Sequence, residues 1–282
     1  MSSLVSGLSG VAAALFATLF PSDCRLCGAD LTNISRLPVC KECLSAMRPI
    51  AGGLCSICGE RVMSPYASSA GEDGVRCGLC RRLEPPYVKA TAYGSYESGL
   101  RELIHLLKYD RVRPAANVLG RMLADAITDL EPLFQDSTVL VVPVPLHVKK
   151  MRQRQFNQSE LIARAALKLK RTENRLELRT GVLERCRETQ SQIGLSRHQR
   201  RENMRGAFAV TMPGEVAGRE ILLTDDVLTT GTTVSECARV LRRAGASKVY
   251  VATVARTLKA DAQQVTQQFE PEEGRMTMAA AS

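Results

Sequence analysis

The sequence contains no tryptophan, and aromatic residues make up only 4% of its 282 residues. Proteins that bind single-stranded nucleic acid commonly stack bases on aromatic side chains, so this scarcity counts against a dedicated single-strand binder. The sequence also lacks any run of about 18 consecutive apolar residues, the length that a membrane-spanning helix needs. The sequence therefore gives no reason to expect a membrane span.

Residues 1–20 include an apolar run but lack both a basic start and an Ala-x-Ala cleavage site. They therefore do not fit a secretory signal, and we expect a cytoplasmic protein. An N-terminal helix is expected over 1–20, either packed on the module that follows or acting as a weak interfacial anchor.

The chain is basic, with a formal net charge of +9 and a pI of about 9.2. Residues 147–206 carry 16 Lys and Arg against 6 Asp and Glu, so this segment accounts for the whole excess. A concentrated positive charge favours anionic partners such as nucleotides or nucleic acid. A solvated basic face would have the same composition.

Eight of the ten cysteines form four Cys-x-x-Cys pairs. This spacing lets both thiolates of a pair face one tetrahedral ion, and two pairs complete a zinc site. Disulfides or a redox dithiol are the alternatives, but disulfides need an oxidising compartment that nothing here indicates. Because every predicted ligand is Cys, no position remains for an activated water, and the two expected Zn²⁺ ions are structural. The predicted ligands are Cys24, Cys27, Cys40, Cys43, Cys55, Cys58, Cys77 and Cys80.

Sequential use of these pairs, the first two for one ion and the last two for the other, is the simplest arrangement. An interleaved arrangement stays open. We expect a small zinc module over residues 21–86, with a hinge to the next domain at 84–86.

Residues 87–257 alternate between apolar runs typical of strands and apolar residues at helical spacing. Strands are expected at 88–93, 139–144, 207–210, 248–254 and from Ile221, and helices at 100–107, 115–130 and 159–169. The alternation predicts an α/β domain with a doubly wound, mainly parallel sheet. Ligands of such sheets bind beyond the carboxyl ends of strands, so Val144 and Asp225 are expected to face one crevice. The tail over 258–282 has no apolar face and is expected to be disordered.

Residues 221–234 carry the strongest chemical signal. An apolar run ends in Asp225 and Asp226, and a hydroxyl-rich loop then leads into a helix. Unpaired N–H groups at a helix N-terminus favour phosphate, and Gly231 permits close backbone approach or a positive φ. The carboxylates suit the hydroxyls of an attached sugar, or a magnesium ion that bridges to phosphate. The stretch thus indicates a site for ribose 5-phosphate, with an ordinary capped turn as the alternative.

This block closely resembles the phosphoribosyl-diphosphate (PRPP) signature of the type I phosphoribosyltransferases. The resemblance implies that Asp225 and Asp226 are the catalytic residues that hold the ribose hydroxyls. It further implies that the loop surrounds the 5-phosphate through Thr229, Thr230, Gly231, Thr232 and Thr233.

The segment after the 139–144 strand brings cations and amides close to where a diphosphate would lie. Lys150 and Arg154 can neutralise the diphosphate, and Asn157 and Gln158 can donate hydrogen bonds to it. We therefore expect a PRPP-binding loop that starts at Val144 and Pro145. The alternative is an exposed, basic helix start.

The stretch 185–205 is too polar for a core and too long for a simple turn. It suits a mobile lid that closes over a polyanion and excludes water, with a solvated helix as the alternative. The candidate lid residues are Arg187, Thr189, Gln190, Arg197, Arg200 and Asn203.

Several stretches together resemble the ComF/GntX family of competence-associated, phosphoribosyltransferase-like proteins. They are 103–109, 143–146, 154–158, 189–190, 195–203 and the block at 221–234. The resemblance implies an N-terminal double zinc ribbon joined to a type I phosphoribosyltransferase fold, and a link to DNA uptake. At one position the chain departs from the family, because Gln155 stands where the family usually has Gly.

The sequence and the resemblance lead to two functional hypotheses. The first is a Mg²⁺-dependent phosphoribosyltransferase that uses PRPP and an acceptor which the sequence does not indicate. The second is a non-catalytic protein that handles single-stranded DNA, or a scaffold whose zinc module docks a helicase-like partner.

Overall fold

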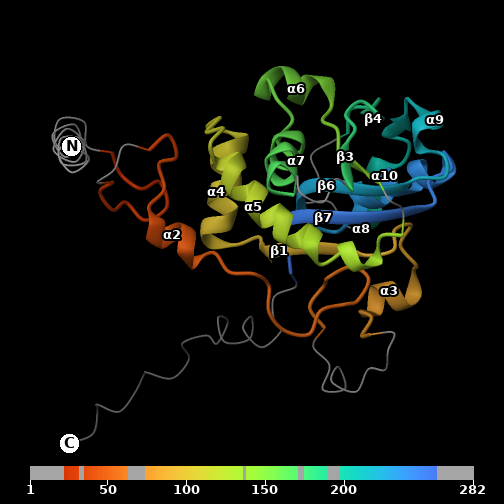
Figure 1. Ribbon diagram of the computed structural model, residues 1–282, viewed down its shortest axis with the longest axis horizontal. Helices are drawn as coiled ribbons and strands as arrows, with labels where there is room; N and C mark the ends of the chain where they lie inside the picture. The colour runs from red at the N-terminus through yellow and green to blue at the C-terminus, as the bar shows by residue number, and fades with distance from the viewer. Residues whose placement is uncertain are drawn as a thin grey trace, which may run out of the picture.

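The computed structural model describes residues 22–31, 35–62, 74–135, 138–170, 175–189 and 197–258 (Figure 1). The expected N-terminal helix and nearly all of the expected tail lie outside these residues. Within the described part of the chain, no helix is both long and apolar enough to cross a membrane.

A five-stranded sheet forms the centre of the molecule, in the order β1-β7-β6-β2-β3. Every pairing in it is parallel, which confirms the mainly parallel sheet expected from the sequence. The strands are β1 (Ala90–Ser95), β2 (Val139–Pro143), β3 (Leu176–Leu178), β6 (Glu220–Leu228) and β7 (Lys248–Arg256). Strand β3 is a short edge strand that the sequence analysis did not predict.

Three helices cover one face of this sheet, as the ribbon view shows (Figure 1). They are α4 (Ser98–Lys108), α5 (Ala115–Thr128) and α7 (Gln158–Leu169). Alternate strand residues meet them, since side chains along a strand point to opposite faces. Val139 and Val141 thus join this core, while Leu140 and Val142 join the core on the other face.

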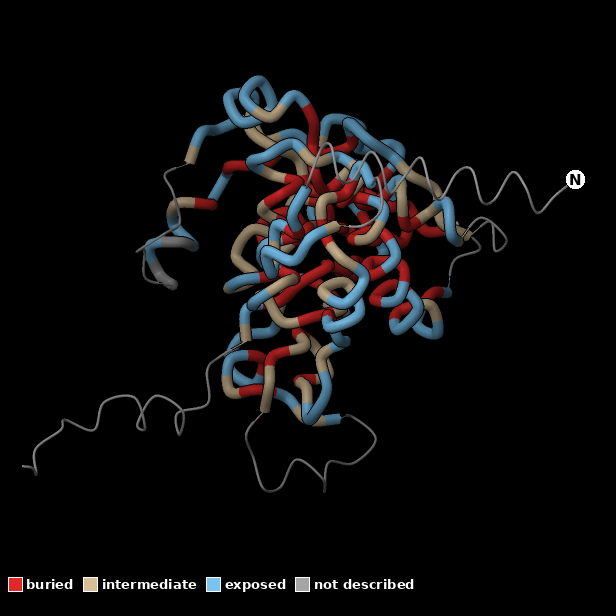
Figure 2. Tube along the Cα trace, turned by 90° about the vertical axis from the view of Figure 1, so that its left-hand side faces the viewer, coloured by how far each residue is buried: buried red, intermediate tan, exposed pale blue. Residues whose placement is uncertain are grey.

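The opposite face is covered by α10 (Thr232–Arg243) and α8 (Arg197–Met204). A separate antiparallel pair lies there too, made of β4 (Leu183–Arg185) and β5 (Phe208–Val210), followed by α9 (Pro213–Val216). Red segments concentrate in the interior of the tube view, where the two cores meet the sheet (Figure 2). The sheet is therefore buried on both faces, as a doubly wound fold requires.

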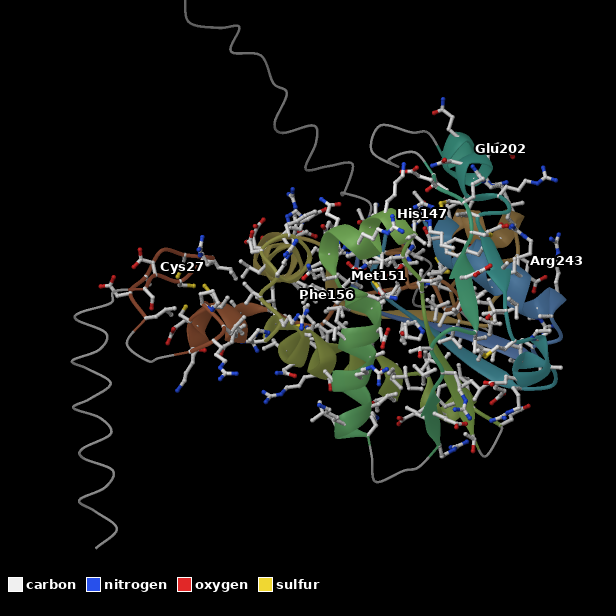
Figure 3. All side chains as sticks on the ribbon, turned by 90° about the horizontal axis from the view of Figure 1, so that it is seen from above. Cys27, His147, Met151, Phe156, Glu202 and Arg243 are labelled. Atoms are coloured by element: carbon white, nitrogen blue, oxygen red, sulfur yellow. The ribbon has the colours of Figure 1, made fainter. Side chains whose placement is uncertain are left out.

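The two halves of the cysteine module contact different parts of the larger domain. The first half, with α2 (Lys41–Ala46), packs beside α4, and the second, with α3 (Gly78–Arg82), lies against the β1 edge of the sheet (Figure 1). The backbone joins them to β1, because the N–H of Ile50 donates to the Tyr93 carbonyl and that of Ala90 to the Ile57 carbonyl, both at 2.7 Å. Seen from above, Cys27 lies far from Arg243 at the end of α10 (Figure 3).

Helices α5 and α7 pack at very short range through Gly120. A Cβ atom added to Gly120 would lie 2.5 Å from the Ala165 Cβ and 3.0 Å from backbone atoms of α7. Because Gly120 has no side chain, α7 can lie close to α5. The N-terminus of α7 then lies at the carboxyl end of the sheet.

We expect Gly120→Ala to lower the free energy of unfolding by about 1–3 kcal/mol, because the new methyl group meets a backbone rather than a flexible side chain. Helix propensity alone predicts the opposite sign, a gain of about 1 kcal/mol. Denaturant unfolding measures the difference. Gly214→Ala is the control, because a Cβ there meets open space and the stability should stay within about 0.5 kcal/mol. A stabilised Gly120→Ala variant would contradict this account of the packing.

Candidate functional site

The candidate site lies where β2 ends beside β6, which continues past this point to Leu228. Pro143 is paired with Thr224, and the N–H of Val144 donates to the Thr224 carbonyl at 2.9 Å. The loop that starts at Val144 and Pro145 therefore leaves the sheet next to Asp225. Val144 and Asp225 are thus neighbours at the carboxyl end of β2, and the crevice that they are expected to face stays a prediction.

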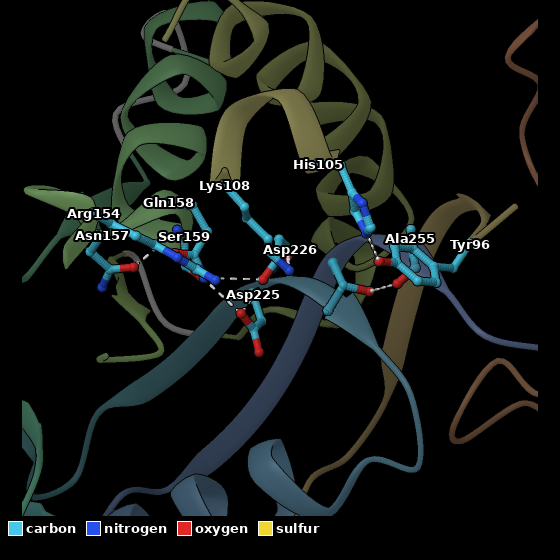
Figure 4. A network of polar contacts seen from close by, with 11 residues as sticks. Tyr96, His105, Lys108, Arg154, Asn157, Gln158, Ser159, Asp225, Asp226 and Ala255 are labelled. Atoms are coloured by element: carbon cyan, nitrogen blue, oxygen red, sulfur yellow. Dashed lines mark hydrogen bonds and ion pairs between the residues drawn. The ribbon is translucent and has the colours of Figure 1, made fainter. Parts of the chain in front are cut away.

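Asp225 is held by two donors at this edge (Figure 4). Its Oδ1 accepts a hydrogen bond from the Ser159 hydroxyl at 2.8 Å and from the Asp226 N–H at 2.9 Å. Burial, reinforced by the adjacent Asp226 carboxylate, raises the pKa of Asp225 from its ordinary 3.8 to about 8. The protonated form of this carboxyl is therefore favoured more strongly than that of a carboxyl in water.

Asp226 is the charged member of the pair and is only 4% exposed. It forms an ion pair with the Lys108 ammonium, and it accepts a hydrogen bond from Gln158 Nε2 at 3.3 Å. Burial favours its protonated form, but the ammonium outweighs this effect and lowers the pKa of Asp226. The pKa values of the two carboxyl groups are thus shifted in opposite directions, and Asp226 carries the negative charge more readily than Asp225.

The segment between β2 and α7 contains a short helix, α6 (Val148–Arg154), that the sequence analysis had given only as an alternative. Gln155 ends it with a φ of 65°, in the left-handed region that glycine adopts at no steric cost. The Gly usual in the family would thus fit this turn without strain. Gln155 adopts the same left-handed conformation although it carries a side chain.

Asn157 and Gln158 lie at the start of α7 and are both buried. Asn157 Nδ2 donates to the Val144 carbonyl at 3.0 Å, while its Oδ1 accepts from the Ser159 N–H at 3.0 Å. Gln158 is fixed from its other side by Arg154, whose guanidinium donates to Oε1 at 2.8 Å. These contacts position Ser159 and Gln158 against the acidic pair, and direct contact with a diphosphate stays a prediction.

The threonine loop follows β6 and leads into α10, whose N-cap is Gly231 at a φ of 76°. The hydroxyls of Thr230 and Thr232 are 2.9 Å apart across this turn. The loop formed by residues 229–233 thus presents hydroxyls and the N-terminal end of a helix, as a phosphate site requires.

Cations gather around the acidic pair in excess of its charge. The pKa of Lys150 is lowered by burial and by the positive charges of Arg185, Arg154 and Lys108. Arg185 lies over the Phe208 ring at 5.6 Å and leaves its buried Nε without a hydrogen-bond partner. Mutually repelling cations suit a polyanion, which would relieve the repulsion.

The expected lid is placed only in part. The Arg187 guanidinium donates to the carbonyls of Asn203 and Arg205, at 2.8 and 2.9 Å, and so ties β4 to the end of α8. Thr189 accepts a hydrogen bond from Arg185. Gln190 lies outside the described residues, as do the side chains of Arg197 and Arg200 on α8. The lid therefore stays a prediction.

Sequence reasoning did not assign Lys108, Ser159 or Arg185 to the site. Lys108 lies in one of the stretches that resemble the family, and Arg185 opens the expected lid, so both had a weak signal. Ser159 directly follows Asn157 and Gln158. Only the fold shows that these three side chains reach the acidic pair or its surroundings.

The cysteines form two groups in the sequential arrangement. Cys24, Cys27, Cys40 and Cys43 make the first, and Cys55, Cys58, Cys77 and Cys80 the second. Zinc lies about 2.3 Å from each thiolate, so a tetrahedral site has sulfur–sulfur edges of about 3.8 Å. The measured separations are 3.7 Å for Cys58 and Cys77 and for Cys27 and Cys40, and 3.9 Å for Cys24 and Cys43. Both groups therefore have the ligands and the dimensions of structural zinc sites.

The second zinc site is joined to the central sheet through Arg256, the last residue of β7. Its guanidinium donates to Cys58 Sγ at 3.7 Å and pairs with Glu60 at 3.3 Å. Arg256 is only 5% exposed. Four thiolates around Zn²⁺ leave a net negative charge, so a buried guanidinium at this place stabilises the loaded site.

Comparison with protein families agrees with this architecture. Residues 15–83 match the model of the double zinc ribbon domain, and residues 166–269 match that of the phosphoribosyl transferase domain. A hypoxanthine phosphoribosyltransferase from Staphylococcus aureus aligns over 51% of this chain and 67% of its own, with 15% identity and a TM-score of 0.33. At this score the likeness adds nothing to the family match. The fold and site thus define a phosphoribosyltransferase-like domain joined to a double zinc ribbon.

Similar chains narrow the assignment further. "Competence protein F" of Haemophilus influenzae is 30% identical over 77% of this chain and 96% of its own. "DNA utilization protein YhgH" of Escherichia coli K12 is 33% identical over 73% and 91%. "Competence protein ComFC" of Bacillus subtilis is 25% identical over 73% and 79%. The chain belongs to the ComF/GntX family.

We expect Arg256→Met to weaken the second zinc site about 10- to 100-fold, the usual effect of removing an outer partner of a metal ligand. Zinc release to a chromogenic chelator should become biphasic, with one ion leaving early and the other at the wild-type rate. Arg256→Lys, which keeps the charge, should be intermediate. Release of both ions at the wild-type rate would show that Arg256 does not support the metal.

The raised pKa of Asp225 makes the stability of the empty protein depend on pH. Between 3.8 and about 8 the folded protein retains a proton that the unfolded chain has released, so the folded state loses stability as the pH rises through this window. Asp225→Asn removes this loss. Its melting temperature should exceed that of the wild type at pH 8 by about 2–4 °C, the shift that about 1 kcal/mol produces at this size, and should match it near pH 4.

Asp226→Asn is the matched control, because the pKa of Asp226 is lowered and its charge is paired with Lys108. This variant should melt below the wild type at pH 8, since it leaves a buried ammonium without a counter-ion. Two variants that melt alike at pH 8 would refute the assignment of one neutral and one charged carboxyl.

Proposed function

We propose that this protein binds PRPP together with Mg²⁺ and transfers its phosphoribosyl group to an acceptor. One observation carries the proposal: an acidic pair, a threonine loop at a helix N-terminus and a cluster of cations surround one edge of the sheet. Each group complements one part of PRPP, which carries a ribose diol between a 5-phosphate and a diphosphate.

In this proposal, Asp225 and Asp226 accept hydrogen bonds from the ribose hydroxyls. Residues 229–233 hold the 5-phosphate through backbone N–H groups and hydroxyls. Lys150, Arg154 and Arg185 attract the diphosphate from the side of α6 and β4. The three contacts would fix the sugar with its C1 atom exposed to the acceptor.

The transfer breaks the bond between C1 and the diphosphate oxygen, and a nucleophile on the acceptor forms a new bond to C1. The departing diphosphate carries the bonding electron pair, so cations placed on it lower the barrier. Magnesium bound to PRPP supplies further charge neutralisation. The diphosphate oxygens are hard donors of the kind that this ion prefers, so PRPP itself would carry the ion into the site. The lid over 185–205 would keep water away from C1.

The names of the relatives guide the biological role. Two carry competence in their names and one carries DNA utilization. On this basis we propose that the protein acts in the cytoplasm on DNA that is taken up or used. The proposed domain boundaries are those expected from the sequence.

A second candidate function is the handling of single-stranded DNA without catalysis. It is favoured by two exposed cations of α6 next to the site, Lys149 and Arg152. Tyr109 is 63% exposed, and the Arg154 guanidinium lies 5.4 Å from the centre of its ring. An exposed aromatic ring flanked by cations can stack a base and neutralise phosphates. A helicase-like partner at the zinc module stays a prediction without a contact to support it.

Calorimetric titration of the zinc-loaded protein with PRPP and Mg²⁺ tests the main proposal. We expect one PRPP per chain, and at least a tenfold loss of affinity for Asp226→Asn, because an amide is a weaker acceptor for the ribose hydroxyls. Glu177→Gln is the control, since this exposed glutamate on β3 pairs with Arg179 instead.

The outcome separates the two candidate functions. A folded, zinc-loaded wild type that does not bind PRPP would rule out the transferase. Binding of a short oligonucleotide that weakens steeply with salt, and weakens again in Tyr109→Ala, would then identify the DNA-handling protein. PRPP binding followed by diphosphate release with a screened acceptor would establish the enzyme.

A further inference from the structure

Lys108 is fixed in place by the helix that carries it. It is the last residue of α4, and α4 is anchored by Leu100, Leu103, Ile104 and Leu107, all of them buried against the sheet. Its own side chain is only 15% exposed. A long cationic side chain ordinarily keeps its charge in water, so the burial of this one needs a cause.

The cause is the acidic pair. The Lys108 ammonium contacts Asp226, whose side chain is 6% exposed, and Asp225 lies beside it. In the close-up, Lys108 descends from the helical layer towards the carboxylates at the end of β6 (Figure 4). A buried, ionised carboxyl group such as that of Asp226 needs a cation, because an uncompensated buried charge is strongly destabilising.

Both carboxyl groups of the acidic pair thus have partners within the protein. Asp226 has the ammonium and the Gln158 amide, and Asp225 has the Ser159 hydroxyl and a backbone N–H. A hydrated divalent cation that approached the pair would meet a fixed positive charge at the place it has to occupy. Repulsion between charges a few ångströms apart is strong where little water screens it.

We infer that Lys108 is an internal cation that keeps free divalent metal ions off the acidic pair. The pair is thereby reserved for the hydroxyls of a ribose, and the metal ion enters with the diphosphate of its substrate. This inference rests on the proposed PRPP site and deepens it. Lys108 acts as a positioning residue, because its charge lets the two carboxyl groups bind a sugar and keeps a free metal ion away.

Binding of Mn²⁺ alone, without PRPP, tests the inference directly. The wild type should bind no Mn²⁺ at the acidic pair, so that wild type and Asp225→Asn bind Mn²⁺ alike. Lys108→Met should gain one site per chain, at least tenfold tighter than any Mn²⁺ binding of the wild type. The double variant Lys108→Met with Asp225→Asn should lose that site again. Electron paramagnetic resonance counts free Mn²⁺ in each titration.

Two further variants separate charge from packing. Lys108→Arg keeps a cation and should behave as the wild type. Lys170→Met removes a lysine that is 12% exposed and ion-paired with Glu131 at 2.7 Å, at the opposite end of α7 from Ser159. It should bind Mn²⁺ as the wild type does. These controls show whether any gain follows from the loss of charge at the pair or from loss of a buried lysine in general.

The inference fails if the wild type binds Mn²⁺ in a way that Asp225→Asn abolishes. This comparison needs no Lys108 variant, so it stands even where Lys108→Met does not fold. A folded, zinc-loaded Lys108→Met that gains no Mn²⁺ site overturns the inference as well.

Neither outcome depends on PRPP. A wild type that fails to bind PRPP would remove the proposed transferase while leaving the Mn²⁺ comparison intact. The converse result, PRPP binding with an acidic pair already open to Mn²⁺, would remove only the role of Lys108.

Discussion

The placement of two adjacent carboxyl groups inside β6, beside the end of β2, is the constraint on which the rest of the site depends. Such a pair cannot be desolvated with two uncompensated charges. The protein places the Lys108 ammonium on Asp226, and the pKa of Asp225 is raised, which favours its neutral form. The C-terminus of α4 and the N-terminus of α7 must therefore both lie at this point of the sheet, because they supply the ammonium and the hydrogen-bond donors.

This arrangement explains why the polar groups around the site mostly contact one another. Arg154 holds Gln158, Gln158 contacts Asp226, and Asn157 links α7 to the end of β2. Each contact fixes a donor before any ligand arrives, so less entropy is lost on binding. Lys150 and Arg185 are cations in excess of the charge of the acidic pair, and a bound polyanion would neutralise them.

The zinc module contributes to the same architecture from outside the sheet. Its first site packs beside α4, the helix that carries Lys108, and its second contacts the end of β7 through Arg256. Small modules with little core gain their stability from the metal. Loss of zinc would therefore disturb the supports of the sheet edge and of α4 before it reached the acidic pair. The zinc ribbon thus supports the larger domain structurally and also presents a surface of its own.

Much of this protein could be predicted from local patterns. The spacing of the cysteines predicted two groups of four thiolates, because a Cys-x-x-Cys turn brings its two thiolates together whatever the rest of the chain does. Apolar periodicity predicted the parallel sheet, and the run from Ile221 to Val234 predicted a strand that carries the adjacent carboxylates and leads towards a helix N-terminus. These features depend on neighbours within a few residues, and the match to the ComF/GntX family rests on the same stretches.

Contacts between distant segments were decided by the tertiary structure alone. Lys108 and Asp226 are 118 positions apart by their numbers, and nothing local shows that the end of α4 meets the end of β6. Ser159 and Arg256 likewise acquire their partners only when α7 and β7 are placed on the sheet. Which of the two carboxyl groups keeps its charge follows from burial and from that one ammonium, and both arise only in the folded chain.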